Sequence, residues 1–544
     1  MNHKYPADSV FLNGTVITMN GRNEIAEAVA IDGDTIQAIG NTKEIEKFIG
    51  PDTEVSDLNG KALTPGFIDS HCHPSTGGPR SLYEVSVHDA ESIDDIIEMI
   101  ESRARELPAG SWILARRYDD RRLREKRHPN RWDLDRAAPG HPVYLMRVDA
   151  CLSTVNSQAL QLAGITRDTP NPKGGIIDRD PDTGEPTGVL REVAQKSIRS
   201  IIPKYSIEQI KEGILAVCRD FAHFGVTSFT DADVDKEGLI AYQELVAENK
   251  MPLRAGILIP FFPMFEHKGY ESEIRNLGLK NGFGNSRLKI VGAKLSSDGS
   301  MSGWTAALHE PYSNEAGNCG VMKLSRDNLI AGIVGAHTAG LRPCIHAIGD
   351  RAIDMVLDAI EIALQEKPDN DSRIRIEKCT LPTPEALQRI RKMGVIPSSL
   401  TGFIYELGSA HLEGIGHDRI KRYIPHKSYI DMGIISSGGS DWSVTSPNVL
   451  QQIYGATTRK SYKGEVIGGN QAISVIDALR LYTINGAYAS FEENIKGSLE
   501  PGKLADLAIL NKNILTVDPE EILGMHVEAT IVGGKTVYHR DGSV

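Results

Sequence analysis

The sequence predicts an α/β fold, a (β/α)₈ TIM barrel that carries a small β-sandwich domain formed by both chain ends. The middle of the chain alternates short apolar runs with helical patterns, which is typical of parallel β-α-β units. Both ends instead carry short strands and tight turns. The first two barrel strands are separated by roughly residues 74–205, far more than an ordinary loop. This gap predicts an inserted subdomain over the barrel mouth.

The two chain ends have the same β-rich texture. Asn13-Gly14 and Asp32-Gly33 lie between apolar runs, and such pairs are strong hairpin signals. The last forty residues or so read similarly. Neither end has enough apolar surface for a core of its own, so we expect the two ends to meet. The expected domains are residues 1–62 with 493–544 for the composite β-domain, and 63–492 for the barrel with 74–205 inserted.

The middle of the chain provides eight candidate barrel strands. They are residues 63–69, 225–231, 253–259, 288–294, 341–347, 372–378, 394–399 and 434–440. Helical patterns lie between them, for example at 207–224, 327–339, 350–366 and 383–392. An open doubly wound sheet is the competing architecture. No glycine-rich phosphate fingerprint follows the first strand, so the barrel is favoured.

Composition narrows the class of protein. With 544 residues, 40% hydrophobic and 24% charged, the chain is typical of a globular protein of about two domains. A formal charge of -12 argues against a nucleic-acid or anionic-membrane partner and leaves a small-molecule substrate. No bilayer-spanning segment or signal peptide is visible. Six scattered cysteines are typical of reduced thiols, so we expect a cytoplasmic protein.

The first barrel strand ends in His71-Cys72-His73. Side chains at i and i+2 share one face of a strand, so the two imidazoles point the same way and can bind one divalent metal. Pro74 then stops the strand, as expected where a barrel strand delivers ligands to a loop-built site. The alternative is a pair of surface histidines, because short motifs match by chance.

Three further strands end in residues suited to a metal centre, namely Lys294, His346 and Asp441. Each has a structural alternative. Lys294 can extend to the surface, His346 can be a hydrogen-bonded core histidine, and Asp441 can cap the next helix. Active sites of barrels lie at the C-terminal ends of the strands. Four strands ending this way at one face favour a metal site.

The motif Pro65-Gly66-Phe67-Ile68-Asp69-Ser70-His71-Cys72-His73 resembles the first-strand signature of the amidohydrolase superfamily. The resemblance continues through residues 294–300, 346–352, 439–442 and 497–506, and so covers essentially the whole chain. Together these segments are similar to the amidohydrolase-3, or YtcJ-like, branch, which includes N-substituted formamide deformylases.

The resemblance implies a metal-bearing barrel with a β-sandwich built from both termini, often as a homodimer. It also implies that His71, His73 and Asp441 hold one metal. Lys294 would be carboxylated and bridge to a second metal, which His346 would also bind.

Two positions depart from the branch pattern. The sixth strand reads Arg375-Ile376-Glu377-Lys378, where the branch normally has Arg-Ile-Glu-His. An ammonium group has no lone pair and repels a cation, so Lys378 puts the second metal in doubt. Lys378 could bind a substrate carboxylate, neutralise developing negative charge, or form a structural ion pair with Glu377 or a neighbour. Cys151 stands where the branch usually has a histidine. We expect an unusual substrate or an altered reaction.

These residues predict hydrolysis of a C–N bond in a small amide, formamide or cyclic amide. The cofactor is expected to be a divalent metal, with zinc favoured and one or two ions bound. The metal would activate water, and Asp441 would act as general base. A deaminase or lyase-type reaction at the same metal is one alternative, and a degenerate, non-catalytic binding protein is another.

A second set of residues is expected to form the substrate pocket, although aromatic side chains there are as often plain packing. It comprises Cys151, Asp298, Trp304 and Trp442.

Overall fold

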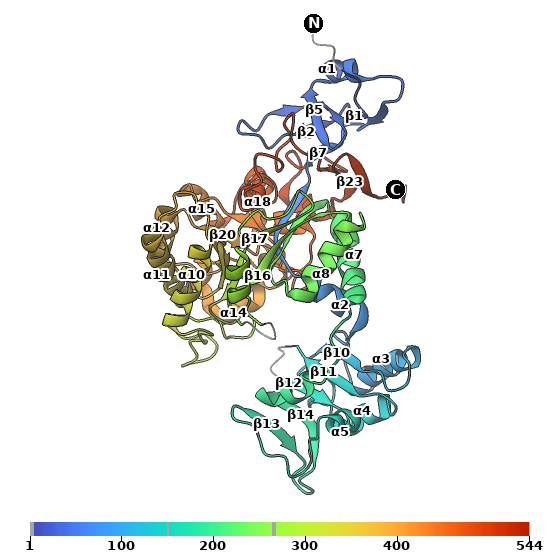
Figure 1. Cartoon of the computed structure of the whole chain (residues 1–544), viewed down its shortest axis with the longest axis vertical. Coiled ribbons are helices and arrows are strands. Elements are labelled where there is room, and N and C mark those ends of the chain that lie inside the picture. The colour runs from blue at the N-terminus through green and yellow to red at the C-terminus, as the bar shows by residue number, and fades with distance from the viewer. Residues whose placement is uncertain (1–4, 149–151, 264–267, 543–544) are drawn as a thin grey trace. The chain divides into compact units, whose positions relative to one another are not determined.

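The computed structural model describes residues 5–148, 152–263 and 268–542 (Figure 1). The chain divides into two compact units. One comprises Met1–Gly77 with Ile214–Val544, and the other comprises Gly78–Gly213.

The first unit contains an eight-stranded sheet in which every neighbouring pair is parallel. The strands, in sheet order, are β8 (Phe67–Cys72), β15 (Val226–Asp231), β16 (Arg254–Pro260), β17 (Leu288–Ser296), β18 (Pro343–Ala347), β19 (Arg375–Lys378), β20 (Ile396–Ser399) and β21 (Ser437–Gly438). Just beyond β21, the Asp441 amide donates to the His71 carbonyl at 2.8 Å. This contact brings the last strand against the first and nearly closes the barrel, confirming the predicted parallel α/β sheet.

Helices follow the barrel strands, as the alternation predicted (Figure 1). They are α7 (Ile207–His223), α8 (Lys236–Ala247), α9 (Glu271–Leu277), α10 (Arg326–Ala339), α11 (Asp350–Glu366), α12 (Pro384–Met393), α13 (Gly402–Glu406), α14 (Gly408–Arg419), α15 (His426–Asp431), α16 (Val449–Thr458), α17 (Val475–Leu481) and α18 (Ile484–Tyr488). Helix α12 shows why the boundaries could be predicted. The Thr383 side chain caps its N-terminus, Pro384 occupies the first turn, and Gly394 ends it at φ 65°. No helix of the described residues is long and apolar enough to cross a membrane.

The prediction of one first strand over residues 63–69 is wrong in one respect, because the structure has two strands there. Strand β7 (Ala62–Pro65) pairs within a terminal sheet, and β8 pairs with β15 in the barrel. The break falls at Gly66, where an added Cβ would lie 2.2 Å from Cγ2 of Thr227. Only glycine allows this close approach, so the chain can pass from one sheet into the other here.

The two chain ends build two sheets with a shared core. The strands are β1 (Ser9–Leu12), β2 (Thr15–Ile17), β3 (Ile25–Ala26), β4 (Ala28–Asp32), β5 (Thr35–Gly40), β6 (Glu54–Asp57), β7, β22 (Leu507–Leu510), β23 (Val527–Val532) and β24 (Lys535–His539), with the short helix α1 (Thr42–Ile45). The sheet orders are β5-β4-β1-β6 and β24-β23-β22-β7-β2-β3. The second sheet therefore combines strands from both ends. One apolar cluster joins Val29 and Ile31 of the first sheet to Leu63, Leu507 and Ile531 of the second.

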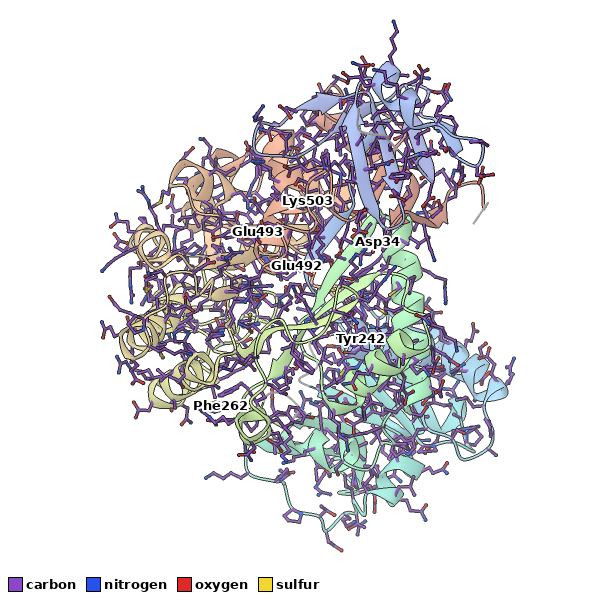
Figure 2. The ribbon with its side chains drawn as sticks, turned by 45° about the horizontal axis from the view of Figure 1, so that its top comes forward. Asp34, Tyr242, Phe262, Glu492, Glu493 and Lys503 are labelled. Carbon is purple, nitrogen blue, oxygen red and sulfur yellow. The ribbon has the colours of Figure 1, made fainter. Side chains whose placement is uncertain are left out.

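Buried ion pairs tie these terminal strands to the barrel. Arg254, the first residue of β16, forms a two-pronged contact with Asp506 at 2.7 and 2.9 Å, and both side chains are buried. Nearby, Glu492, which is labelled in Figure 2, forms ion pairs with Lys289 at 3.1 Å and with Lys496 at 2.7 Å. These contacts lie at the N-terminal ends of the barrel strands, where they stabilise the fold, and the C-terminal ends are left for the site.

The second unit has a six-stranded sheet and a core of its own. Its order is β13-β14-β12-β11-β10-β9. The elements are α2 (Pro74–Tyr83, which begins in the first unit), β9 (Val85–Ser86), α3 (Ile93–Glu106), β10 (Ile113–Tyr118), α4 (Arg131–Ala137), β11 (Val143–Arg147), β12 (Leu152–Val155), α5 (Ser157–Leu162), β13 (Gly175–Arg179), β14 (Pro186–Glu192) and α6 (Lys196–Arg199). Its core includes Ile96, Ile100, Leu134 and Leu145. A position over the barrel mouth stays a prediction.

Candidate metal centre

Three potential metal ligands converge at the point where the barrel closes. The ligand atoms of His71, His73 and Asp441 all lie within 4.8 Å of one another. Oδ1 of Asp441 is 3.4 Å from Nε2 of His71 and 3.2 Å from Nε2 of His73. His71 belongs to β8, and His73 follows it directly. Two imidazoles and one carboxylate oxygen around one point form a set that suits a divalent metal.

The buried His71 ring is prepared for ligation. Its Nδ1 lies 2.5 Å from Oε2 of Glu377. Burial, together with the charge of Lys294, lowers the pKa of His71 to about 4, so the ring is neutral at pH 7. With the proton held on Nδ1 by the carboxylate, the lone pair is left on Nε2. Nε2 is buried and has no hydrogen-bond partner among the described residues. This nitrogen could ligate a metal ion.

Glu377 is itself fixed by Arg375, two residues earlier on β19. Oε1 lies 2.8 Å from Nε of Arg375, and Oε2 lies 2.9 Å from Nη2. Both side chains are fully buried. Burial alone would raise the pKa of Glu377, but Arg375 and His71 hold it well below its usual range. The sequence analysis did not identify this pair. The available signal was the i, i+2 spacing, which places both side chains on one strand face.

Asp69 joins the two strands that supply the ligands. Its Oδ1 accepts from the amides of His71 and Ser440, each at 3.1 Å, and its Oδ2 accepts from Oγ of Ser440 at 2.5 Å. At Gly439, an added Cβ would lie 2.9 Å from the His71 nitrogen. Glycine there permits the close approach that sets Asp441 beside the histidines. The sequence analysis did not assign Asp69 a role.

Lys378 contacts the same aspartate from another side. Its Nζ pairs with Oδ2 of Asp441, and it lies 5.5 Å from the centre of the Phe403 ring. Burial would raise the pKa of Asp441, but Lys378 and both histidines hold it well below its usual range. The sequence analysis allowed an ion pair between Lys378 and Glu377 or a neighbour. In the structure the partner of Lys378 is Asp441, which the fold brings close.

Lys294 and His346 lie outside the three-residue cluster. Burial lowers the pKa of Lys294, and within the described ranges its ammonium makes no hydrogen bond or ion pair. Nε2 of His346 lies 2.8 Å from the Gly299 carbonyl and 3.4 Å from Oδ1 of Asp298. Nε2 of His346 is therefore hydrogen-bonded to the backbone, which matches the alternative, given in the sequence analysis, of a hydrogen-bonded core histidine.

The expected pocket residue Asp298 is buried and accepts three backbone amides. The donors are the nitrogens of Ala307 and Gly349 at 3.0 Å and of Ile348 at 3.1 Å. These bonds hold the segments that follow β17 and β18 in place. Asp298 therefore shapes the loops at the C-terminal ends of the strands.

The two expected pocket tryptophans are both partly buried. Trp304 packs against Tyr312, with ring centroids 5.4 Å apart. Trp442 packs edge-to-face against Phe221 at 6.1 Å, and its carbonyl accepts from the His73 amide at 2.7 Å. Cys151 lies outside the described residues. The pocket role of all four expected residues stays a prediction.

The chain is similar to known proteins along almost its whole length. The amidohydrolase family model, Amidohydro_3, matches residues 54–538. The N-substituted formamide deformylase of Arthrobacter pascens is 29% identical over 551 residues, covering 98% of this chain and 99% of that protein. Protein LONG AFTER FAR-RED 3 of Arabidopsis thaliana is 30% identical over 545 residues, covering 98% and 92%. A crystal structure of an uncharacterized metal-dependent hydrolase from Pyrococcus furiosus superposes with a TM-score of 0.77 at 26% identity, covering 93% of this chain and 100% of that one.

Proposed function

Because this chain belongs to the amidohydrolase family, we propose that it is a metal-dependent hydrolase that cleaves a C–N bond of a small molecule. The substrate class is an amide, a formamide or a cyclic amide. One observation carries the proposal. The ligand atoms of His71, His73 and Asp441 lie within 4.8 Å of one another, and the buried Nε2 of His71 makes no hydrogen bond among the described residues. A buried polar atom without a partner is costly, and a metal ion removes that cost.

The three residues fit a divalent ion, and zinc is the proposed metal because it favours imidazole nitrogen and carboxylate oxygen in four-coordinate sites. When bound, such an ion lowers the pKa of water and polarises a substrate carbonyl. Glu377 keeps the His71 proton on Nδ1 and so keeps Nε2 available.

Proton transfer is assigned to Asp441. Its Oδ1 faces both histidines, so Oδ2 is the oxygen that remains to accept the proton of the attacking water and to pass it to the leaving nitrogen. Lys378 contacts Oδ2 and keeps the carboxylate ionised before the reaction. The same ammonium can offset negative charge that develops on the substrate oxygen.

A screen of N-formyl and N-acyl amines with zinc-loaded protein tests the reaction class. His71→Ala should lower kcat/KM by roughly a thousandfold or more, because it removes a ligand of the metal that activates water. His309→Ala is a matched control, since His309 is paired with Asp354 in an exposed contact. Hydrolysis that survives His71→Ala would contradict metal catalysis. Zinc-loaded protein that hydrolyses no amide would favour the non-catalytic binding protein.

A further inference from the structure

We propose that the Lys378 ammonium is a built-in cation that limits this centre to a single divalent ion. The inference rests on the proposed metal-dependent function and concerns how many ions the site accepts.

The position of Lys378 is set by its backbone. It is the last residue of β19 and has φ 76°, and Cys379 follows with φ 37°. Two successive non-glycine residues in the left-handed region are uncommon and are retained where the surroundings fix them. The side chain is 10% exposed, and it reaches Asp441 and the face of Phe403. A lysine that only avoided burial would extend its ammonium to water.

The two oxygens of Asp441 face different partners. Oδ1 lies 3.2 and 3.4 Å from the two histidine nitrogens, whereas Oδ2 contacts Nζ of Lys378. A carboxylate that bridges two metal ions offers one oxygen to each. Here the second oxygen faces an ammonium group, which is positively charged and has no lone pair to share with a metal ion. Lys378 therefore occupies the position from which Asp441 would reach a second ion.

Three side chains near Lys378 that could bind a second ion already have partners. Nε2 of His346 is committed to the Gly299 carbonyl at 2.8 Å, and both oxygens of Asp298 accept backbone amides. Glu377 is already neutralised by Arg375. A second divalent ion at Oδ2 of Asp441 would thus meet the Lys378 ammonium at close range, and this repulsion is strong where water is excluded.

Zinc titration of metal-free protein, with metal analysis of the saturated sample, tests the proposal. The wild type should bind one zinc ion per chain. Lys378→Met removes the charge at similar length, and its first zinc ion should bind at least about tenfold tighter because repulsion is lost. Lys378→Arg keeps the charge and should still bind one ion with Kd near the wild-type value.

Lys496→Met is the matched control. Lys496 is equally buried, and it pairs with Glu492 at 2.7 Å and Ser228 at 2.9 Å, outside the metal site. Its zinc Kd should be unchanged. If Lys378→Met does not fold, as judged by thermal unfolding, Lys378→Gln replaces it.

The outcomes separate the two proposals. Two zinc ions per wild-type chain would overturn the single-ion inference and leave the hydrolase proposal standing. An unchanged zinc Kd in Lys378→Met would overturn the role of the charge. A wild-type protein that binds no zinc would overturn the metal-dependent function itself.

Discussion

Replacing Glu377 with glutamine tests how the metal centre is supported. Oε2 of the carboxylate lies 2.5 Å from His71 Nδ1 and accepts from Nη2 of Arg375 at 2.9 Å, while Oε1 lies 2.8 Å from Nε of Arg375 as an ion pair. Glutamine has the same shape but a single acceptor oxygen, and its NH₂ group would face N–H donors. Glu377→Gln thus loses the charge and sets donor against donor in a fully buried site.

Two effects of different size follow. Breaking a buried ion pair by removing one partner costs about 3–5 kcal/mol, because Arg375 is left buried without a counter-charge. Loss of the carboxylate that orients a ligating histidine lowers metal affinity by about 10- to 100-fold, or roughly 1.4–2.7 kcal/mol. We therefore expect both lower stability and weaker zinc binding, with the larger change in stability.

Urea unfolding followed by tryptophan fluorescence measures the first effect, and zinc titration against a competing chelator measures the second. Glu492→Gln is the control, because Glu492 is also buried and pairs with two lysines away from the site. It should lose stability without a change in zinc Kd. A zinc Kd within twofold of wild type in Glu377→Gln would refute the role assigned to Glu377.

Three other perturbations give independent checks. Burial lowers the pKa of His411 and of His426 to about 3, whereas in the unfolded chain it is near 6.5. The folding stability that these neutral histidines contribute is therefore fully present above about pH 6.5. It falls as the pH drops towards 3, by up to about 1.4 kcal/mol per histidine for each pH unit. Urea midpoints from pH 7 to 5 should fall, and less steeply for His411→Gln; equal slopes would contradict this. Gly66→Val should destabilise by about 1–3 kcal/mol, because its Cβ would meet Thr227, and a wild-type urea midpoint would count against the close approach. Zinc at a hundredfold excess over Kd should stabilise the protein by about 2.7 kcal/mol, and thermal unfolding that EDTA leaves unchanged would argue against a bound ion.

The barrel could be predicted because its strands are buried on both faces and so read as continuous apolar runs. Residues 288–294 and 341–347 were expected as strands, and they correspond to β17 and β18. The break at Gly66 could not be predicted in the same way. It depends on Thr227, which is distant along the chain, and the apolar pattern continues across it.

Only the site residues that lie at the ends of expected barrel strands could be predicted from the sequence. His71, His73 and Asp441 each lie just beyond an expected barrel strand, so their convergence follows from the barrel topology. The partners of Lys378 and Glu377 were not predictable. Glu377 and Lys378 are neighbours on one strand, so their side chains point to opposite faces and contact different partners. Their partners His71 and Asp441 are distant along the chain and come close only when the barrel closes.

The sheet made from both chain ends has a consequence for synthesis on the ribosome. Strand β7 lies between β2, which is made shortly before it, and β22, which is made after all the barrel strands. Until β22 emerges, one edge of β7 is bare, and such an edge invites pairing with other chains. Through Gly66, β7 runs directly into β8, which carries His71. The histidines are made first, but the strand that delivers them is secured only after all the barrel strands have been made.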